Sequence, residues 1–238
     1  MRHGATVAAV IPALNEAPAI GRVIAAIPPW VDRVVVADNG STDGTAKIAR
    51  AMGARVVCEP RRGYGAACQA GIRAAGRRDV IVFLDGDFAD DPGRMAALVD
   101  PIAAGEADLV LGSRVRGGAE PGALTLPQRF GNALACWLMR RLWGARYTDL
   151  GPFRAIRRPA LARLEMRDMD FGWTVEMQVK ALVAGLAVRE VPTAYRRRIG
   201  RSKISGTLRG TVAAGVKILS VIVRAALTRR AGPASGAR

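Results

Sequence analysis

The chain has 238 residues, half of them hydrophobic, and this length and apolar content fit one α/β domain with a substantial core. Its 36 Lys and Arg outnumber 20 Asp and Glu, so the formal net charge of +16 indicates an anionic partner, either nucleic acid or an anionic lipid surface. The single histidine, His3, and three cysteines without a CxxC pair argue against Ser-His or Cys-His catalysis, a disulfide framework and a cysteine zinc site.

The cysteines and the amino-terminal segment indicate the cellular compartment of the protein. Three cysteines without a pairing pattern fit a reducing cytoplasm. Polar Asn15 and Glu16 interrupt the first apolar run, so we expect neither a secretory signal nor an amino-terminal membrane anchor. The protein is therefore expected to be cytoplasmic.

Short β-branched runs alternate with helical patterns along the first half of the chain. The predicted strands cover residues 6–11, 33–37, 55–58, 80–84 and 108–111. The predicted helices cover residues 18–27, 44–52, 65–75 and 92–104. This alternation predicts a doubly wound, mostly parallel sheet with helices on both faces.

Polar clusters follow four of these strands, at residues 12–16, 38–43, 85–87 and 112–114. In an open parallel sheet ligands bind beyond the carboxyl ends of the strands, so we expect these loops to meet at one rim. The dinucleotide fingerprint GxGxxG is missing after the first strand, which argues against a nicotinamide or flavin enzyme.

Asp85 and Asp87 leave the end of the fourth strand together. Carboxylate oxygens suit hard divalent cations such as Mg²⁺ or Mn²⁺, which commonly bridge protein carboxylates to phosphate oxygens. Asp-x-Asp is also common in solvated turns at strand ends, so the pair alone does not define a metal site. Together with the neighbouring polar loops it predicts a metal ion and a diphosphate at this rim.

The carboxyl-terminal part is strongly basic, with eleven Lys or Arg and no acid from Arg196 onward. Residues 207–230 are predicted to form an amphipathic helix, and residues 231–238 a disordered tail. Lys217 shortens the apolar run, so a helix at the membrane interface is preferred to a spanning one; the alternative is that it covers the domain's own core or a partner subunit. The expected apolar face consists of Leu208, Val212, Val216, Leu219 and Val223, with Lys217 and Arg224 opposite.

Five motifs occur in order: Val10-Ile-Pro-Ala-Leu-Asn-Glu16, Ala37-Asp-Asn-Gly-Ser-Thr-Asp-Gly44, Asp85-Gly-Asp87, Gly112-Ser-Arg114 and Gly200-Arg-Ser-Lys203. The ordered set resembles the family 2 glycosyltransferases of GT-A fold. Within that family it most resembles the polyprenyl-phosphate (dolichyl-phosphate) mannosyl and glucosyl synthases. The resemblance implies a GT-A domain over residues 1–206.

The resemblance also implies a site for a nucleotide diphosphate sugar. The donor-binding residues would be Pro12, Leu14 and Glu16 around the nucleotide, Asp38 at the base edge, Asp85, Gly86 and Asp87 at the ribose, diphosphate and metal, Arg114 at phosphate or sugar, and Arg197 and Lys203 over the phosphates. For Arg197 and Lys203 the alternative is a solvated basic loop. Ala89 stands where the family often has a Gln that joins the metal shell, so water or donor phosphate oxygens would fill that position.

Residues 148–154 resemble the family's acceptor segment. Asp149 would act as a general base toward a hydroxyl acceptor or hold Arg154 in place, and Arg154 would bind an acceptor phosphate or form a scaffold ion pair. Glu176 falls where many family members place an acid near the acceptor, although a Glu in a first helical turn also complements the helix dipole. The implied catalytic set is Asp85, Asp87, Arg114, Asp149 and Glu176.

The resemblance implies an inverting, metal-dependent hexosyltransferase that uses UDP-glucose or GDP-mannose and polyprenyl phosphate, peripheral to the inner face of the membrane. An acceptor phosphate is anionic near neutral pH, with a second pKa of about 6, so it needs no general base. The first alternative keeps the donor but takes a soluble sugar or small hydroxyl acceptor. A nucleic-acid binder is disfavoured because Tyr195 is the only aromatic residue next to the basic cluster, and single-stranded nucleic acids stack on several such residues. A homo-oligomer is compatible with the sequence.

Overall fold

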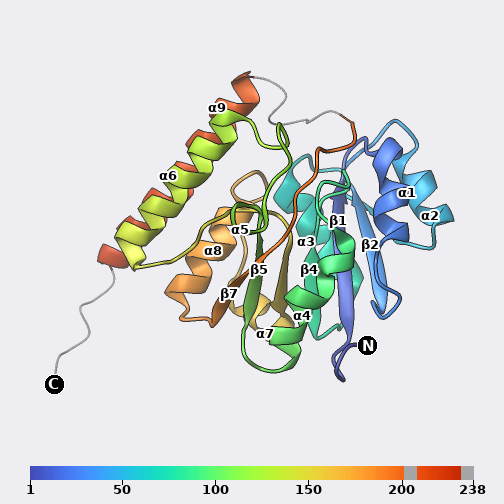
Figure 1. The fold of residues 1–238 in the computed structure, drawn as a ribbon, viewed down its shortest axis with the longest axis horizontal. Coiled ribbons are helices and arrows are strands. Elements are labelled where there is room, and N and C mark those ends of the chain that lie inside the picture. Colours follow the sequence, from blue (N-terminus) through green and yellow to red (C-terminus); the bar gives the residue numbers. More distant parts are fainter. Residues whose placement is uncertain (201–207, 232–238) are drawn as a thin grey trace.

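A seven-stranded sheet forms the centre of the molecule, in the order β3-β2-β1-β4-β6-β5-β7 (Figure 1). The computed structural model describes residues 1–200 and 208–231. The strands are β1 (Val7–Ala13), β2 (Arg33–Asp38), β3 (Arg55–Cys58), β4 (Val80–Phe83), β5 (Leu109–Ser113), β6 (Arg154–Arg157) and β7 (Val188–Pro192). Neighbouring strands pair in parallel except β6, which runs antiparallel between β4 and β5.

Helices connect most of the strands. They are α1 (Ala17–Ala25), α2 (Thr45–Ala51), α3 (Tyr64–Ala75), the 3₁₀ turn η1 (Pro92–Arg94), α4 (Met95–Ala103), α5 (Arg114–Gly117), α6 (Leu126–Trp143), α7 (Arg158–Arg163), α8 (Trp173–Val183) and α9 (Leu208–Ala231). The strands and helices predicted in the first half are confirmed, with ends shifted by no more than two residues. The elements β6, β7 and α6 are not predicted from the sequence pattern.

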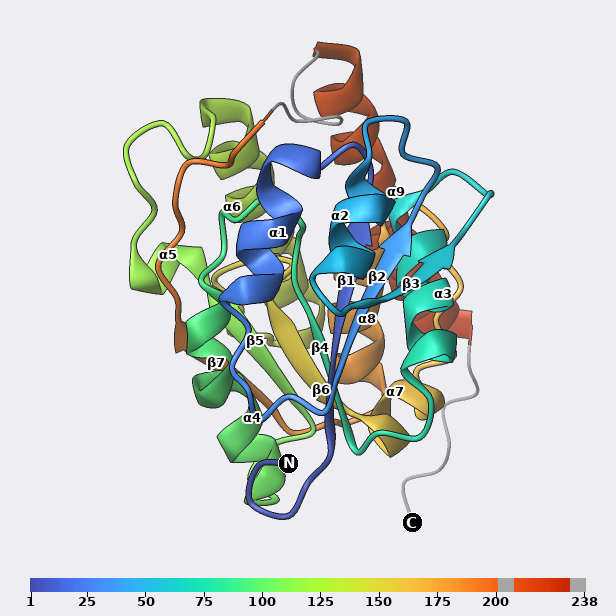
Figure 2. The ribbon, with the colours of Figure 1, turned by 90° about the vertical axis from the view of Figure 1, so that its right-hand side faces the viewer.

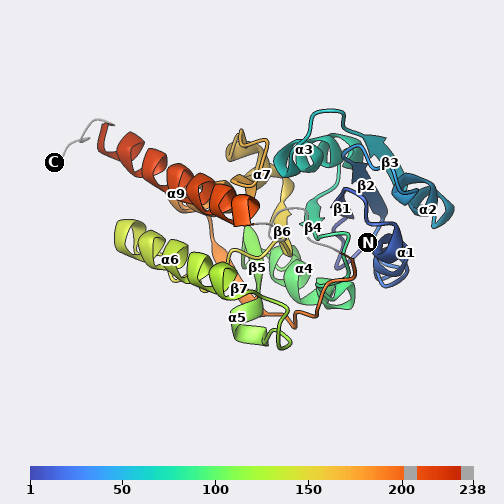
Figure 3. The same ribbon diagram turned by 90° about the horizontal axis from the view of Figure 1, so that it is seen from above.

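Apolar layers cover both faces of the sheet. Along β1, Val7, Ala9 and Ile11 face one layer and Ala8 and Val10 the other, because successive side chains of a strand alternate. Side chains of α1, α2 and α4 belong to the first layer, and those of α3, α7 and α8 to the second. Figures 2 and 3 show these helices packed around the sheet. Strands buried on both faces are continuous apolar runs, which is why the sequence reveals them.

A third apolar cluster joins α6, α8 and α9. The helices α6 and α9 lie side by side (Figures 1 and 3), and Ile222 of α9 is fully buried with Ile218 and Val221 packed in the same cluster. Val216 and Val223, two members of the apolar face expected for this helix, are 62% and 51% exposed. Helix α9 therefore has apolar side chains both on the protein's own core and in solvent, and the membrane-facing role expected for its apolar face stays a prediction.

Within residues 1–200 and 208–231, no helix combines the length and apolar character needed to cross a membrane.

Candidate active site

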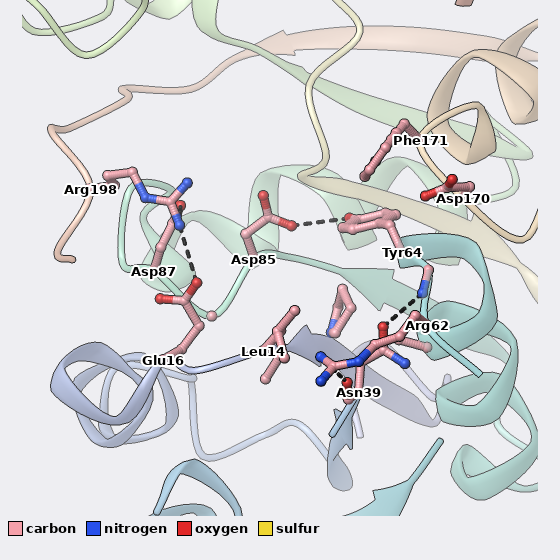
Figure 4. Close-up of a pocket in the computed structure, with 15 residues that line it drawn as sticks. Leu14, Glu16, Asn39, Arg62, Tyr64, Asp85, Asp87, Asp170, Phe171 and Arg198 are labelled. Atoms are coloured by element: carbon pink, nitrogen blue, oxygen red, sulfur yellow. Dashed lines mark hydrogen bonds and ion pairs between the residues drawn. The ribbon is translucent and has the colours of Figure 1, made fainter. Parts of the chain in front are cut away.

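A cavity of about 360 Å³, here named the rim cavity, lies at the carboxyl ends of β1, β2 and β4 (Figure 4). This is the rim at which ligands bind in such sheets. Of the residues expected at the donor, Pro12, Leu14, Glu16, Asp85, Gly86 and Asp87 line it. Asn39, Arg62, Tyr64, Asp170, Phe171 and Arg198, which the sequence analysis did not assign to the site, line it as well.

Asp85 and Asp87 follow β4 into this cavity (Figure 4). The Tyr64 hydroxyl donates to Asp85 Oδ1 at 3.0 Å, and Asp87 Oδ1 accepts from the Ala89 backbone N–H at 2.9 Å. Burial, and next the charge of Asp87, raise the pKa of Asp85 to about 7. Two close carboxylates in a buried site favour a bound cation, because the cation offsets their mutual repulsion.

Arg198 spans the carboxylates of Glu16 and Asp87. Its Nη2 lies 3.1 Å from Glu16 Oε1 and 3.3 Å from Asp87 Oδ2. The donor role expected for Arg197 stays a prediction, because its Nε donates to a backbone carbonyl at 2.7 Å and the residue does not line the cavity. Lys203, the other expected cation, lies outside the described residues. The basic segment therefore brings Arg198 to the carboxylates.

Asn39 organises the opposite side of the rim cavity (Figure 4). Its amide nitrogen donates to two backbone carbonyls of the 59–63 loop at 2.9 and 2.7 Å, and its Oδ1 accepts from the Gly63 N–H at 2.9 Å. These bonds hold the loop that carries Arg62 to the cavity. Asp38 does not line the cavity, and its carboxylate accepts from a backbone N–H at 3.2 Å. The role of Asp38 at the base edge therefore stays a prediction.

Two glycines at the start of α3 allow a second loop to approach the cavity. A Cβ at Gly63 or at Gly65 would lie 2.1 Å from a backbone carbonyl oxygen of the 168–171 loop. No side chain fits at that distance, so this approach requires glycine at both positions. The same loop supplies Asp170 and Phe171 to the lining (Figure 4).

Arg114 and Asp149 form a buried bidentate ion pair. Arg114 Nε and Nη2 lie 2.8 and 2.7 Å from the two Asp149 oxygens, and the backbone N–H groups of Arg114 and Leu150 donate to the same carboxylate at 2.7 and 2.8 Å. Burial alone would lower the pKa of Arg114, but the hydrogen bond and charge of Asp149 outweigh it and raise that pKa. Asp149 therefore holds Arg114, and the role expected for it toward Arg154 stays a prediction.

A second cavity, of about 390 Å³, is here named the α6 cavity. Arg114, Arg129, Asn132 and Thr148 are among its lining residues. Asn132 is fixed by its own hydrogen bonds, since its Nδ2 donates to Thr148 O at 3.0 Å and its Oδ1 accepts from the Leu150 N–H at 2.8 Å. One carboxylate, Glu120, also lines the cavity and accepts from the Arg197 N–H at 2.9 Å. The two guanidinium groups can bind a phosphate.

Arg154 and Glu176, both expected near the acceptor, line neither of these cavities. Arg154 is 1% exposed and donates to backbone carbonyls and to Gln178, and burial lowers its pKa to about 10. Glu176 accepts from two backbone N–H groups and pairs with Lys180 at 2.7 Å. Their hydrogen bonds support structural roles, and the roles expected for them at the acceptor stay predictions.

Asp90 is a buried carboxylate near the site. It is 3% exposed, and neither oxygen has a hydrogen-bond partner among the described residues. Burial, and next the charge of Asp85, raise the pKa of Asp90 well above its usual value. The unfolded group ionises near pH 4, so above that pH the folded state binds more protons than the unfolded state and stability falls as pH rises.

Replacing Asp90 with asparagine is expected to remove this penalty in the metal-free protein. The stability gain should be absent near pH 4 and should increase with pH by up to about 1.4 kcal/mol per unit until the folded pKa is reached. Thermal unfolding in chelator at pH 5 and pH 8 measures this stability gain. Asp91→Asn is the control for the loss of a carboxylate, because Asp91 is the next residue in the chain but is only half-buried and caps η1. A gain of equal size at both pH values would contradict this explanation.

The carboxylate pair fits a hard divalent ion. Among residues 1–200 and 208–231, no three or more His, Cys, Asp or Glu are grouped so as to hold a metal. Asp85 and Asp87 would thus be the protein ligands of the metal ion. Donor phosphate oxygens and water would complete its coordination shell, as is common for Mg²⁺.

Comparison with known proteins agrees with this geometry. The model of the family "Glycosyl transferase family 2" matches residues 8–164. An uncharacterised glycosyltransferase of Mycobacterium tuberculosis is 39% identical over 222 residues, which cover 92% of this chain and 99% of that protein. A dolichyl-phosphate hexose transferase of Haloferax volcanii is 36% identical over 219 residues, which cover 90% and 92% of the two chains.

The fold is also that of a solved enzyme. Glucosyl-3-phosphoglycerate synthase from Mycobacterium tuberculosis, in complex with Mn²⁺, UDP-glucose and phosphoglyceric acid, matches with a TM-score of 0.76 and 27% identity over 98% of this chain and 82% of that one. A second structure of that enzyme contains Mg²⁺ and UDP. The predicted GT-A fold is confirmed, and the predicted divalent ion agrees with both complexes. The chain belongs to glycosyltransferase family 2.

Proposed function

We propose that this glycosyltransferase transfers a hexose from UDP-glucose or GDP-mannose to polyprenyl phosphate. The observation that carries the proposal is the presence of two sites of different chemistry, a rim cavity with paired carboxylates and an α6 cavity lined by Arg114 and Arg129. The first suits a metal-bound diphosphate and the second an anionic acceptor. The similarity to a dolichyl-phosphate hexose transferase supports a lipid phosphate as that acceptor.

In the rim cavity the protein acts on the departing diphosphate. Breaking the bond to the anomeric carbon builds negative charge on the nucleoside diphosphate, and preorganised cations lower the barrier by stabilising that charge. Arg198 is oriented for this by Glu16 and Asp87. Asp85 and Asp87 would hold the divalent ion, which supplies Lewis-acid stabilisation of the same charge.

In the α6 cavity the protein binds and orients the acceptor. The bidentate contact with Asp149 keeps the Arg114 guanidinium in one position, and Arg129 lines the same cavity from α6. The Asp149 carboxylate accepts four hydrogen bonds, about as many as it has lone-pair sites. A phosphate acceptor needs no base, which agrees with a carboxylate occupied in this way.

The acceptor assignment is tested by comparing polyprenyl phosphate with the free polyprenol and with 3-phosphoglycerate. We expect transfer to the lipid phosphate, and we expect Arg129→Ala to raise its KM roughly tenfold or more without changing the KM of the donor. Arg141→Ala on the same helix is the control, because Arg141 does not line the cavity. Transfer to 3-phosphoglycerate in place of the lipid would favour a soluble acceptor, which the complex of the solved enzyme with phosphoglyceric acid makes the second candidate.

The surface of α6 and α9 supports a location at the membrane. Leu126, Phe130 and Trp137 are 78%, 71% and 56% exposed and share one face of α6, and Val216 and Val223 are exposed on α9. Helix α6 has three arginines and no acid. Exposed apolar and aromatic side chains among basic residues suit the surface of an anionic bilayer. The protein would thus be peripheral at the inner face of the membrane.

Removing the two aromatic side chains of α6 is expected to weaken membrane binding. Together, Phe130→Ser and Trp137→Ser should lower the partition onto vesicles containing anionic phospholipid roughly 10–100-fold, because apolar area no longer leaves water. Vesicle co-sedimentation measures this, with Val183→Ser on α8 as the control since Val183 is 60% exposed on another helix. Equal binding by the double variant and the wild type would exclude α6 as the contact surface.

A further inference from the structure

Phe88, the residue that follows Asp87, has an unusual backbone conformation. Its φ is +62°, in the left-handed region that glycine adopts readily and that bulky side chains rarely adopt. Such a conformation persists only where the surrounding structure enforces it, and it occurs preferentially at functional sites. A phenylalanine at this position therefore indicates that its ring makes contacts that glycine could not make.

Two guanidinium groups lie over the Phe88 ring. The Cζ atom of Arg22, on α1, is 4.6 Å from the ring centroid, and the Cζ atom of Arg196 is 5.3 Å from it. Both distances are within the roughly 6 Å over which an aromatic face attracts a cation. The ring also packs against the apolar layer that contains side chains of α1, α2 and α4. Phe88 therefore joins α1 and the core to the chain segment that contains Arg196.

This segment is hydrogen-bonded to the turn after β4. The Arg196 N–H donates to Ala89 O at 2.8 Å, and the Ile199 N–H donates to Asp87 O at 2.9 Å. The two accepting residues come directly before and after Phe88 in the chain. The segment and the turn therefore pair around Phe88.

Arg198 lies in the same segment, between these two backbone donors. Its guanidinium contacts the carboxylates of Glu16 and Asp87 in the rim cavity (Figure 4). The side chain of Arg197 instead donates to the loop that precedes α6. This alternation is that of an extended segment, in which residues two apart share one side. The contact of Arg196 with the ring therefore also sets the side to which Arg198 points.

We propose that Phe88 is a positioning residue, whose ring seats this segment on the turn so that Arg198 is held at the donor diphosphate. Leucine or glycine at this position lacks the aromatic face that attracts the guanidinium groups. The inference rests on the role proposed above for Arg198 in stabilising the charge of the diphosphate. It does not depend on which acceptor the enzyme uses.

Calorimetry with UDP and with GDP in the presence of Mn²⁺ tests this role. We expect Phe88→Leu and Phe88→Gly to weaken binding of the diphosphate that the wild type binds by roughly fivefold or more, although glycine relieves the backbone strain. Phe88→Tyr keeps the ring and should bind within about twofold of the wild type. Trp30→Leu is the matched control and should also bind within about twofold, because the Trp30 ring has Arg2 Cζ at 5.2 Å and packs on the same apolar layer but does not line the rim cavity.

A double-mutant cycle shows whether Phe88 acts through Arg198. In an Arg198→Ala background, Phe88→Leu should weaken binding less than about twofold further, because the side chain that the ring positions is already absent. If thermal unfolding shows that Phe88→Leu does not fold, Arg196→Gln tests the same contact, since the Arg196 side chain is 39% exposed. An equal loss in both backgrounds, or binding by Phe88→Gly equal to that of the wild type, would overturn the proposal.

Hydrogen exchange of the protein without nucleotide or metal gives a second measurement. The Arg196 and Ile199 amides donate to the turn, so Phe88→Leu should accelerate their exchange roughly fivefold, while Trp30→Leu should not. If the wild type bound neither UDP nor GDP, the proposed donor would be wrong, and the exchange rates would still report whether the ring seats the segment. Unchanged exchange of both amides in Phe88→Leu would overturn the proposal.

Discussion

Replacing Asp149 with alanine is expected to lower the free energy of unfolding by about 3–5 kcal/mol, because it leaves the Arg114 guanidinium buried without its counter-charge. Asp149 is 1% exposed and meets Arg114 through two side-chain contacts, at 2.7 and 2.8 Å. The substitution also removes the acceptor of two backbone N–H groups. Urea denaturation of both proteins measures the difference.

A surface ion pair gives the matched control. Glu106 and Arg189 form an ion pair in which both side chains are about half exposed. Glu106→Ala should cost less than about 1 kcal/mol, since solvent already screens that pair. A cost for Asp149→Ala as small as that of Glu106→Ala would show that Asp149 does not anchor Arg114.

Replacing Asp87 with asparagine is expected to lower kcat/KM for glycosyl transfer by at least about 10²-fold with the fold retained. The neutral amide weakens the hold on a divalent ion and removes one of the two carboxylates that orient Arg198. The asparagine Oδ1 can still accept from the Ala89 N–H, so the turn after β4 is preserved. Initial rates with Mn²⁺ and thermal unfolding of the same preparations measure the two effects.

Asp91→Asn is the control for this loss of charge, because Asp91 follows in the same loop but does not line the rim cavity. It should keep transfer within about threefold of the wild type. If Asp87→Asn retained transfer within tenfold, Asp87 would have no part in metal binding or in charge stabilisation.

The parallel half of the sheet is predictable from the sequence because its strands are buried on both faces and read as short apolar runs between helical patterns. The strand β6 escapes this reasoning. It has four residues, begins and ends with arginine, and is inserted antiparallel between strands that come earlier in the chain. Arg154 is also an exception to the rule that charged residues lie on the protein surface, because its buried guanidinium donates hydrogen bonds to backbone carbonyls in the core. Only the tertiary structure supplies those carbonyls.

The candidate site is predictable where its residues directly follow a strand, as with Asp85, Gly86 and Asp87. Its remaining members come from loops whose path depends on long-range contacts. Arg198 and Arg197 are adjacent in a run of arginines, and nothing local shows which one turns toward Asp87. Tyr64 reaches Asp85 from the start of α3. The flanking glycines Gly63 and Gly65 are the sequence signal that indicates a close approach there.

Transfer of labelled hexose from UDP-glucose and GDP-mannose to short-chain polyprenyl phosphate, with Mg²⁺ or Mn²⁺, tests the proposed function most directly. Label that moves into the organic phase with metal, and fails to move with chelator or with Asp87→Asn, is the expected result and identifies the donor. Metal-dependent release of hexose from the donor without any lipid product would contradict the lipid-phosphate acceptor.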